Sequence, residues 1–264
     1  MKMMKKIKRF KTEIMKKIEH IFFSGNTLYY PGCLTKYVMK DIKKNYEMLL
    51  EKMGINYIEL GDLENCCGSP AINAGYKEDF INLIKKNYEI FKMHSIKKII
   101  TNCPACFYTL NKLYPKYFPK WDIKAEYFTE VMLSAVKKGK IKFKKEWRNC
   151  KNPTKITYHD PCHLGRYSNI YNSPRELLEL AGYKIIEMKD TKENSMCCGA
   201  GGGVGSNNKK LSRKIGDERI KQAIETKVSI LSTTCPLCTK HLDFSSKKKI
   251  KVKEFSEAMV ERIE

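Results

Sequence analysis

Two short stretches of the sequence decide the fold. Residues 98–106 read KIITNCPAC, and residues 228–238 read VSILSTTCPLC. Each stretch starts with a β-rich apolar run, which is typical of a buried strand, and continues into a Cys-Pro-x-Cys turn. Proline fits the first position of a helix because it has no N–H group to leave unpaired and its φ angle is already helical. Both stretches therefore predict a strand that leads to a cysteine at the start of a helix.

Each Cys-Pro-x-Cys turn completes a pattern of five cysteines that occurs twice. The pattern is a single cysteine, then Cys-Cys-Gly, then Cys-Pro-x-Cys, with similar gaps in both copies. Ten of the eleven cysteines belong to it, whereas Cys150 lies outside both copies and is interpreted as incidental. The first set is Cys33, Cys66, Cys67, Cys103 and Cys106, and the second set is Cys162, Cys197, Cys198, Cys235 and Cys238.

Strand-like and helix-like segments alternate in both halves of the chain. This alternation predicts an α/β fold with a small, mostly parallel sheet flanked by helices in each half. Cysteines that follow strands should then gather at the carboxyl edge of each sheet. We expect strands at residues 27–30, 55–60, 98–101, 156–158, 184–188 and 228–232, and helices at residues 38–53, 79–93, 174–181 and 211–226.

The repeat also predicts the domain organisation. Residues 27–150 and 151–264 each carry one cysteine set, so we expect two duplicated domains joined in a lysine-rich stretch. In residues 1–26, which precede them, apolar residues recur at helical spacing with basic residues between them. This spacing predicts a basic amphipathic helix. The helix could pack on its own domain, dock on a partner protein or bind an anionic membrane surface.

The number of cysteines in each set bears on the group that the set could hold. Four thiolates suffice for one zinc ion or one cubane iron-sulfur cluster, whereas five favour a cluster with several separate iron corners. Cys103 and Cys235 should lie at helix N-termini, where exposed N–H groups and the helix dipole stabilise a thiolate. Glycines beside the cysteine pairs should let the backbone approach a bulky inorganic group closely; the candidates are Gly68, Gly199 and Gly201.

Three other uses of the cysteines compete with this interpretation. A disulfide framework is disfavoured by the odd number of cysteines and by the lack of a secretory signal. A redox dithiol would use two cysteines of a set and leave three without a role. Zinc in one or both sites stays open, because Cys-x-x-Cys turns are common zinc ligands and sequence alone does not name the metal.

With these motifs, the chain resembles the cysteine-rich CCG-domain proteins over about residues 27–260. Besides the ten cysteines, the resemblance is carried by YYPGC at residues 29–33, YHDPCHLGR at residues 158–166 and CCGAGGGV at residues 197–204. The family includes heterodisulfide reductase B and D subunits of methanogens and iron-sulfur subunits of glycolate oxidase and anaerobic glycerol-3-phosphate dehydrogenase. The resemblance implies that each set holds a noncubane [4Fe-4S] cluster, with all ten cysteines as ligands.

The resemblance also carries expectations about function and partners. Many family members carry a ferredoxin-like segment that this sequence lacks, so electrons should come from a separate protein, either ferredoxin-like or a flavoprotein. The glycine-rich residues 199–205 lack the spacing of a nucleotide-binding fingerprint. The family implies an iron-sulfur oxidoreductase subunit that reduces a disulfide, or an electron-transfer subunit of a flavin-linked 2-hydroxyacid or glycerol-3-phosphate dehydrogenase. A noncatalytic zinc-binding or assembly module is the alternative.

The charge of the chain limits its partners and its place in the cell. The formal net charge is +22, from 51 Lys and Arg against 29 Asp and Glu. Such a surface would attract an acidic electron donor. No motif with base-reading geometry occurs, so we expect no nucleic-acid partner. The apolar stretches are too short to span a membrane and no secretory segment is recognisable, so we expect a cytoplasmic protein.

Ionisable side chains flank one cysteine of the second set. His159, His163 and Arg166 stand on both sides of Cys162. They could supply protons or bind an anionic group of a substrate, which makes them candidate catalytic residues. A local hydrogen-bond network in the loop would explain the same residues. No equivalent side chains stand next to Cys33 in the first half.

Overall fold

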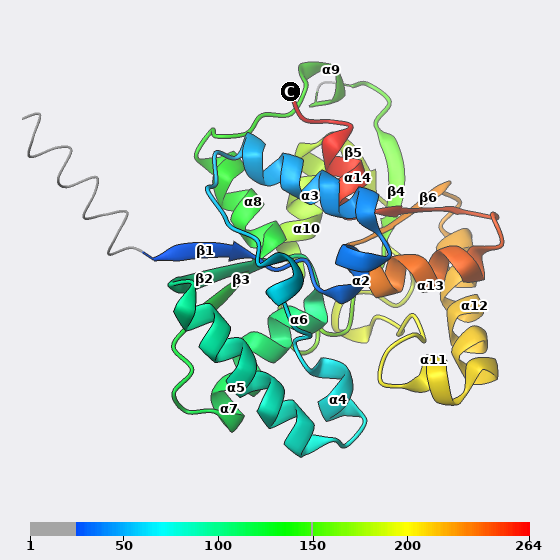
Figure 1. Cartoon of the computed structure of the whole chain (residues 1–264). Coiled ribbons are helices and arrows are strands. Elements are labelled where there is room, and N and C mark those ends of the chain that lie inside the picture. The colour runs from blue at the N-terminus through cyan, green and yellow to red at the C-terminus, as the bar shows by residue number, and fades with distance from the viewer. Residues whose placement is uncertain (1–24, 149) are drawn as a thin grey trace, which may run out of the picture.

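The computed structural model in Figure 1 describes residues 25–148 and 150–264. The amphipathic helix expected at the N-terminus falls mainly on residues 1–24 and so lies outside the described part of the chain. Within that part, no helix is both long enough and apolar enough to cross a membrane.

The first half forms a three-stranded parallel sheet in the order β1-β2-β3. Its strands are β1 (Asn26–Tyr29), β2 (Ile96–Thr101) and β3 (Lys124–Tyr127). A 3-10 turn spans Gly61–Leu63, and a π-helical turn spans Thr109–Leu113. The helices are α2 (Cys33–Tyr37), α3 (Lys40–Lys52), α4 (Ser69–Asn73), α5 (Lys77–Met93), α6 (Pro104–Tyr108), α7 (Tyr114–Tyr117) and α8 (Phe128–Lys137).

The second half forms a four-stranded parallel sheet in the order β5-β4-β6-β7. Its strands are β4 (Thr154–Tyr158), β5 (Tyr183–Ile185), β6 (Ile230–Thr233) and β7 (Lys251–Glu254). A 3-10 turn spans Lys192–Asn194. The helices are α9 (Lys145–Arg148), α10 (Asn172–Leu180), α11 (Val204–Asn207), α12 (Lys209–Glu225), α13 (Pro236–Ser246) and α14 (Phe255–Val260). The predicted α/β class with two parallel sheets is confirmed.

Two features of the sheets differ from the sequence-based expectation. The strand predicted at residues 55–60 is reduced to a single bridge between Leu28 and Ile58, and a 3-10 turn follows it at Gly61–Leu63. The sequence patterns did not predict the edge strands β3 and β7. Their sequences, KAEY and KVKE, are short and rich in charged residues. Charged residues are common on edge strands because they discourage pairing with another chain.

Alternate residues of β1 serve two different hydrophobic clusters. Leu28 packs in a cluster with Phe80 and Ile84 of α5, whereas the neighbouring Tyr29 packs in a cluster that includes Leu49 of α3. The first sheet is therefore covered on both faces, with α5 on one side and α3 and α8 on the other (Figure 1). Such burial on both faces is typical of parallel sheets.

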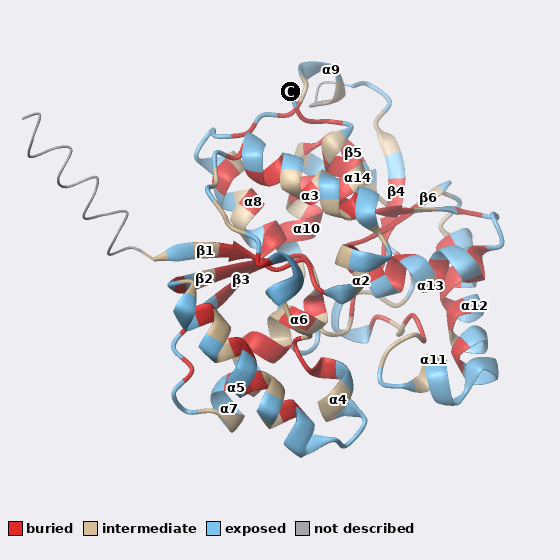
Figure 2. Ribbon diagram, in the orientation of Figure 1, coloured by how far each residue is buried: buried red, intermediate tan, exposed pale blue. Residues whose placement is uncertain are grey.

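The two halves share one of these hydrophobic clusters. It combines residues of α3 and α8 with residues of α10 and α14, and each of these helices has buried segments (Figure 2). Polar contacts also cross between the halves. The Tyr46 hydroxyl donates to Glu254 Oε1 at 2.6 Å, and the hydroxyls of Thr129 and Ser173 lie 2.8 Å apart. The shared layer holds the two sheets in a defined relation to each other.

Candidate metal centres

The Cys-Pro-x-Cys turns lie at the carboxyl edges of the two sheets. Cys103 is the N-cap residue of α6 and follows β2, and Cys235 is the N-cap residue of α13 and follows β6. In both helices proline occupies the first turn. The expected arrangement of strand, cysteine and helix is therefore confirmed, and both thiols lie where a helix dipole favours negative charge.

All five thiols of the first set lie together. The thiols neighbour one another in the order Cys33, Cys66, Cys67, Cys106 and Cys103, and each influences the pKa of the one before it. Cys33 is exposed, whereas Cys67 and Cys106 are buried. The set thus runs from the protein interior to the surface.

The second set repeats the same order of contacts. The thiols neighbour one another in the order Cys162, Cys197, Cys198, Cys238 and Cys235, and each influences the pKa of the one before it. Cys162 is half-buried, and the members from Cys198 onwards are buried. All eleven cysteines of the chain lie in its described part, and none forms a disulfide.

The electrostatics of both sets suit a bound cationic group. Hydrogen bonds from Cys106 and Cys66 lower the pKa of Cys67 to about 5, and hydrogen bonds from Cys162 and Cys198 lower the pKa of Cys197 to about 2. Other members have raised pKa values, because neighbouring sulfurs and burial disfavour a further negative charge. Five thiolates can coexist at such a site only with positive charge among them, which metal ions supply.

Backbone N–H groups of the Cys-Cys-Gly turns point at sulfur atoms. The Gly68 N–H donates to Cys66 Sγ at 3.4 Å, and the Gly199 N–H donates to Cys197 Sγ at 3.3 Å. Both glycines have positive φ angles, and a Cβ atom at position 199 would lie 2.6 Å from the backbone oxygen of Ser212. Glycine is therefore required in both turns.

Gly201 is in a different situation from these two glycines. No atom lies within 4 Å of the position that a Cβ atom would take there. Gly32, which the sequence did not single out, lies closer to a cysteine set, because a Cβ atom at this position would sit 3.0 Å from Cys106 Sγ. A close approach of backbone to sulfur is thus found at Gly32, and the role of Gly201 stays a prediction.

One hydroxyl group connects the two Cys-Pro-x-Cys turns. The Tyr127 hydroxyl lies 3.1 Å from the carbonyl oxygen of Asn102 and 2.8 Å from that of Thr234. These residues immediately precede Cys103 and Cys235. Burial raises the pKa of Tyr127, so its hydroxyl stays protonated and can donate. The two cysteine sets therefore lie on either side of the contact between the halves.

The three candidate catalytic side chains point to different places. The His163 ring lies beside the second set, with Nδ1 3.5 Å from Cys162 Sγ. The exposed Arg166 donates to the backbone oxygens of Glu193 and Ser195. His159 is only 1% exposed and lies in the interior. The structure thus does not gather the three into one constellation, and the burial of His159 argues against its direct contact with a substrate.

His163 lies at the contact between the halves. Its ring centroid is 5.8 Å from that of Tyr108, which follows the first Cys-Pro-x-Cys turn, and 5.0 Å from that of Tyr167. Burial lowers the pKa of His163, which favours its neutral form. A half-buried imidazole next to Cys162 is the best placed of the three candidates for proton transfer.

Sequence reasoning missed the partners of His159 and Asp160, which precede Cys162 in the chain. Asp160 forms a bidentate ion pair with Arg175, at 2.7 and 2.8 Å. Burial alone would raise the pKa of Asp160, but Arg175 holds it below its usual value. His159 Nδ1 accepts a hydrogen bond from Arg219 Nε at 3.0 Å. A detectable signal was present, because Arg219 shares a helix face with the small residues Gly216 and Ala223.

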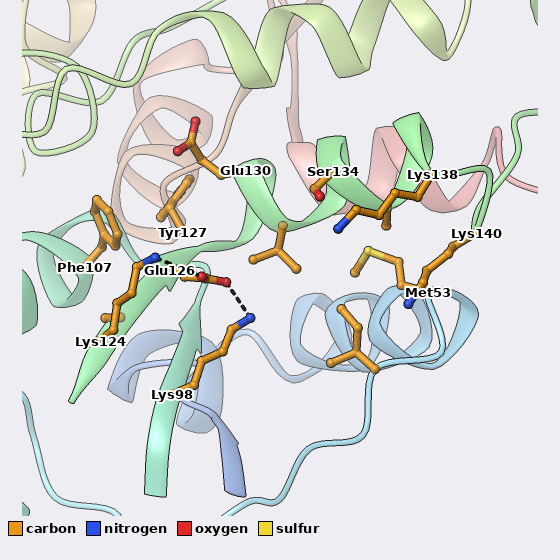
Figure 3. Close-up of a pocket in the computed structure, with 14 residues that line it drawn as sticks. Met53, Lys98, Phe107, Lys124, Glu126, Tyr127, Glu130, Ser134, Lys138 and Lys140 are labelled. Atoms are coloured by element: carbon orange, nitrogen blue, oxygen red, sulfur yellow. Dashed lines mark ion pairs between the residues drawn. The ribbon is translucent and has the colours of Figure 1, made fainter. Parts of the chain in front are cut away.

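A separate pocket of about 480 Å³ lies against the first sheet (Figure 3). None of the ten cysteines in the two sets lines it. Figure 3 shows Glu126 between two lysines, and its carboxylate pairs with Lys98 at 2.6 Å and with Lys124 at 3.3 Å. Lys138 and Lys140 line the opposite side of the pocket. The pocket is thus distinct from both cysteine sets.

Comparisons with known proteins agree with this geometry. The model of the cysteine-rich CCG domain matches residues 27–111 and 156–243, one match for each cysteine set. The D subunit of the dihydromethanophenazine:CoB–CoM heterodisulfide reductase of Methanosarcina barkeri is 35% identical over 83% of this chain and 53% of its own length.

Two further relatives have similar identity. The EtfAB:quinone oxidoreductase of Syntrophomonas wolfei is 32% identical over 80% of this chain and 30% of its own length. The probable iron-sulfur-binding oxidoreductase FadF of Bacillus subtilis is 31% identical over 89% of this chain and 32% of its own length. The chain thus spans about half the length, or less, of these curated relatives. On the two domain matches and the geometry of both cysteine sets, the chain belongs to the cysteine-rich CCG domain family.

Proposed function

We propose that this chain is an iron-sulfur oxidoreductase subunit that holds one four-iron cluster in each cysteine set. The observation that carries the proposal is the contact of five thiols in the same order at both sites. Relatives named as a heterodisulfide reductase subunit and as an iron-sulfur-binding oxidoreductase support it. We also propose that the two matched regions are duplicated domains, with bounds near residues 27–150 and 151–264.

Each group of residues has its own part in holding a cluster. The ten cysteines would be the iron ligands, and such a cluster accepts and donates single electrons. The N–H groups of Gly68 and Gly199 and the helix N-termini at Cys103 and Cys235 would stabilise the negative charge on sulfur. Gly201 would leave room on the outer side of the second set.

The reaction that fits this site best is the reduction of a disulfide at the contact between the halves. Cleavage of a disulfide takes up two electrons and two protons and releases two thiols. The electrons would come from a partner protein, and His163 would deliver protons beside Cys162. Arg166 is exposed and would attract an anionic group of the substrate. The packing of His163 against Tyr108 of the first half and Tyr167 of the second supports this role.

The proposed electron donor is an acidic protein, either ferredoxin-like or a flavoprotein. The formal net charge of +22 would increase its rate of encounter with this chain. A relay role, as an electron-transfer subunit of a flavin-linked dehydrogenase, uses the same cysteines and the same donor surface. Because the proposed chemistry needs free thiols, we place the protein in the reducing cytoplasm.

Metal analysis tests the proposal. Protein purified without oxygen should be brown and should contain acid-labile sulfide and about eight irons, if both sites hold four-iron clusters. A noncatalytic zinc module would instead be colourless and contain stoichiometric zinc. Zinc without sulfide would contradict the proposed function.

A further inference from the structure

The second cysteine set has a buried imidazole at its inner end. One ring nitrogen of His159 and the Sγ atoms of Cys198 and Cys238 all lie within 4.8 Å of one another. Since His159 Nδ1 accepts from Arg219, Nε2 is the nitrogen left for the sulfurs. Nε2 is buried and has no hydrogen-bond partner in the described part of the chain. A buried N–H group without a partner is costly, so a hydrogen-bond acceptor at this place is expected.

Arg219 decides which nitrogen of His159 carries the proton. The guanidinium group can only donate hydrogen bonds, so His159 Nδ1 must offer its lone pair. In a neutral imidazole, the proton then resides on Nε2. A protonated Nε2 has no free lone pair and cannot bind a metal ion. His159 is therefore a hydrogen-bond donor toward the sulfurs and not an additional ligand.

Arg219 itself is a buried cation without a carboxylate partner. It is fully buried, and it forms no salt bridge within the described residues. Its other hydrogen bonds go to the Asp190 carbonyl, the Gln222 amide oxygen and the Ser195 hydroxyl, at 2.6 to 3.0 Å. A buried charge is expensive unless an opposite charge is near. The negative charges that act on Arg219 are first those of Asp160, Asp190 and Glu187, which form no salt bridge with it, and then that of Cys238 in the second set.

The corresponding place in the first set has different chemistry. Tyr30 stands there, and its neighbours include Cys67 and Cys106, the counterparts of Cys198 and Cys238. Its hydroxyl does not donate to sulfur but to the backbone oxygen of Asn65, at 2.6 Å. The first set therefore has neither the N–H donor nor the cation behind it.

We propose that His159 donates a hydrogen bond from Nε2 to the sulfur of Cys198 or Cys238, with Arg219 as the residue that positions it, and that this pair raises the reduction potential of the second cluster. The inference rests on the proposed function, because it requires a cluster in the second set. Hydrogen bonds and positive charge near cluster sulfurs favour the reduced, more negative state. The two clusters of one chain would thus differ in potential, with the second easier to reduce.

Redox titration of three variants, followed by EPR, tests this inference. In His159→Phe, one midpoint potential should fall by the equivalent of about tenfold in the reduction equilibrium, or ~59 mV for one electron. His159→Gln should keep the wild-type value, because its amide can accept from Arg219 and donate to sulfur. Tyr30→Phe is the matched control in the first half, and it should leave unchanged the midpoint potential that falls in His159→Phe. Unchanged midpoints, or equal shifts of both, in iron-replete His159→Phe would overturn the inference.

A second measurement leaves His159 in place and so does not depend on how a substitution at this buried position folds. Pulsed EPR on ¹⁵N-histidine-labelled His163→Ala protein, which lacks the imidazole beside Cys162, should show a weak nitrogen coupling to one reduced cluster, as expected for a hydrogen-bonded ring. A strong coupling, as for a nitrogen bound to iron, or no coupling at all, would overturn the assignment of His159 as donor. Protein that holds no iron in either set would instead contradict the proposed function, so the two failures are distinguishable.

Discussion

The two cysteine sets have the same internal order of contacts but different surroundings. Next to the exposed end, Leu34 follows Cys33 in the first set, whereas His163 follows Cys162 in the second. At the inner end, a tyrosine in the first set is replaced by a histidine backed by Arg219 in the second. The comparison teaches that a ligand pattern can repeat while the charge and proton donors around it do not. Two sites with the same ligands can then differ in potential and in reactivity.

The helices behind the two sets show the same contrast. Asn87 of α5 stands at the position that Arg219 occupies in α12, by the spacing that separates Cys103 from Cys235. Its amide donates to the Cys66 backbone oxygen at 3.0 Å and to the Tyr114 hydroxyl at 2.9 Å. The first half thus places a neutral amide where the second half places a cation.

The largest effect should come from removing one ligand in either set. Cys67→Ala should remove or remodel the first cluster only, and Cys198→Ala the second only, because each thiol contacts members of its own set. Iron and sulfide should fall by roughly half in each variant. Equal loss from both sites in either variant would mean that the two clusters are coupled and would weaken the comparison.

The next effect concerns the exposed ends of the sets. His163→Ala should slow disulfide reduction by roughly 100-fold without loss of iron, since a positioned general acid contributes about this much. Leu34→Ala, at the matching position beside Cys33, should change the rate little. The assay uses an artificial electron donor and a small disulfide. An unchanged rate in His163→Ala would favour the relay role.

A smaller, pH-dependent effect should come from the ends of the edge strands. Glu254, which ends β7, is buried and caps α14, whereas Tyr127, which ends β3, bears no charge. Burial raises the pKa of Glu254 to about 7 from its usual 4.5. Its contribution to stability is therefore full below the unfolded value and is lost as the pH rises through about 7.

Thermal unfolding measures this effect. The melting temperature of the wild type should fall between about pH 5 and about pH 8 relative to that of Glu254→Gln, which cannot ionise. Parallel pH profiles of the two proteins would show that Glu254 stays ionised in the folded state. The ends of β7 and β3 would then not differ in their pH-dependent contribution to stability.

The smallest effect is expected for the cysteine outside the two sets. Cys150 is exposed, and its thiol donates a hydrogen bond to the backbone oxygen of Asn152. Cys150→Ala should leave the iron content, the absorption spectrum and both midpoint potentials as in the wild type. A loss of iron in this variant would show that an eleventh sulfur takes part in holding the clusters.

Sequence patterns predicted the parts of the fold that depend on local chemistry. Apolar periodicity located α3, α5 and α12 to within a few residues, and proline after cysteine predicted the starts of α6 and α13. These signals are local because helix formation and capping involve neighbouring residues. The parallel sheets followed from the alternation of strands and helices.

What the sequence by itself determined is thus the set of ten cysteines, their division into two fives and the α/β class. Only the tertiary structure decided which side chains surround each five. The link through Tyr127 and the pair of His159 with Arg219 join residues far apart in the chain, and no local spacing predicts them. The physical reason is that a buried polar group must find its partner in space. That partner depends on how helices such as α12 pack against the sheet, and only the folded chain settles this.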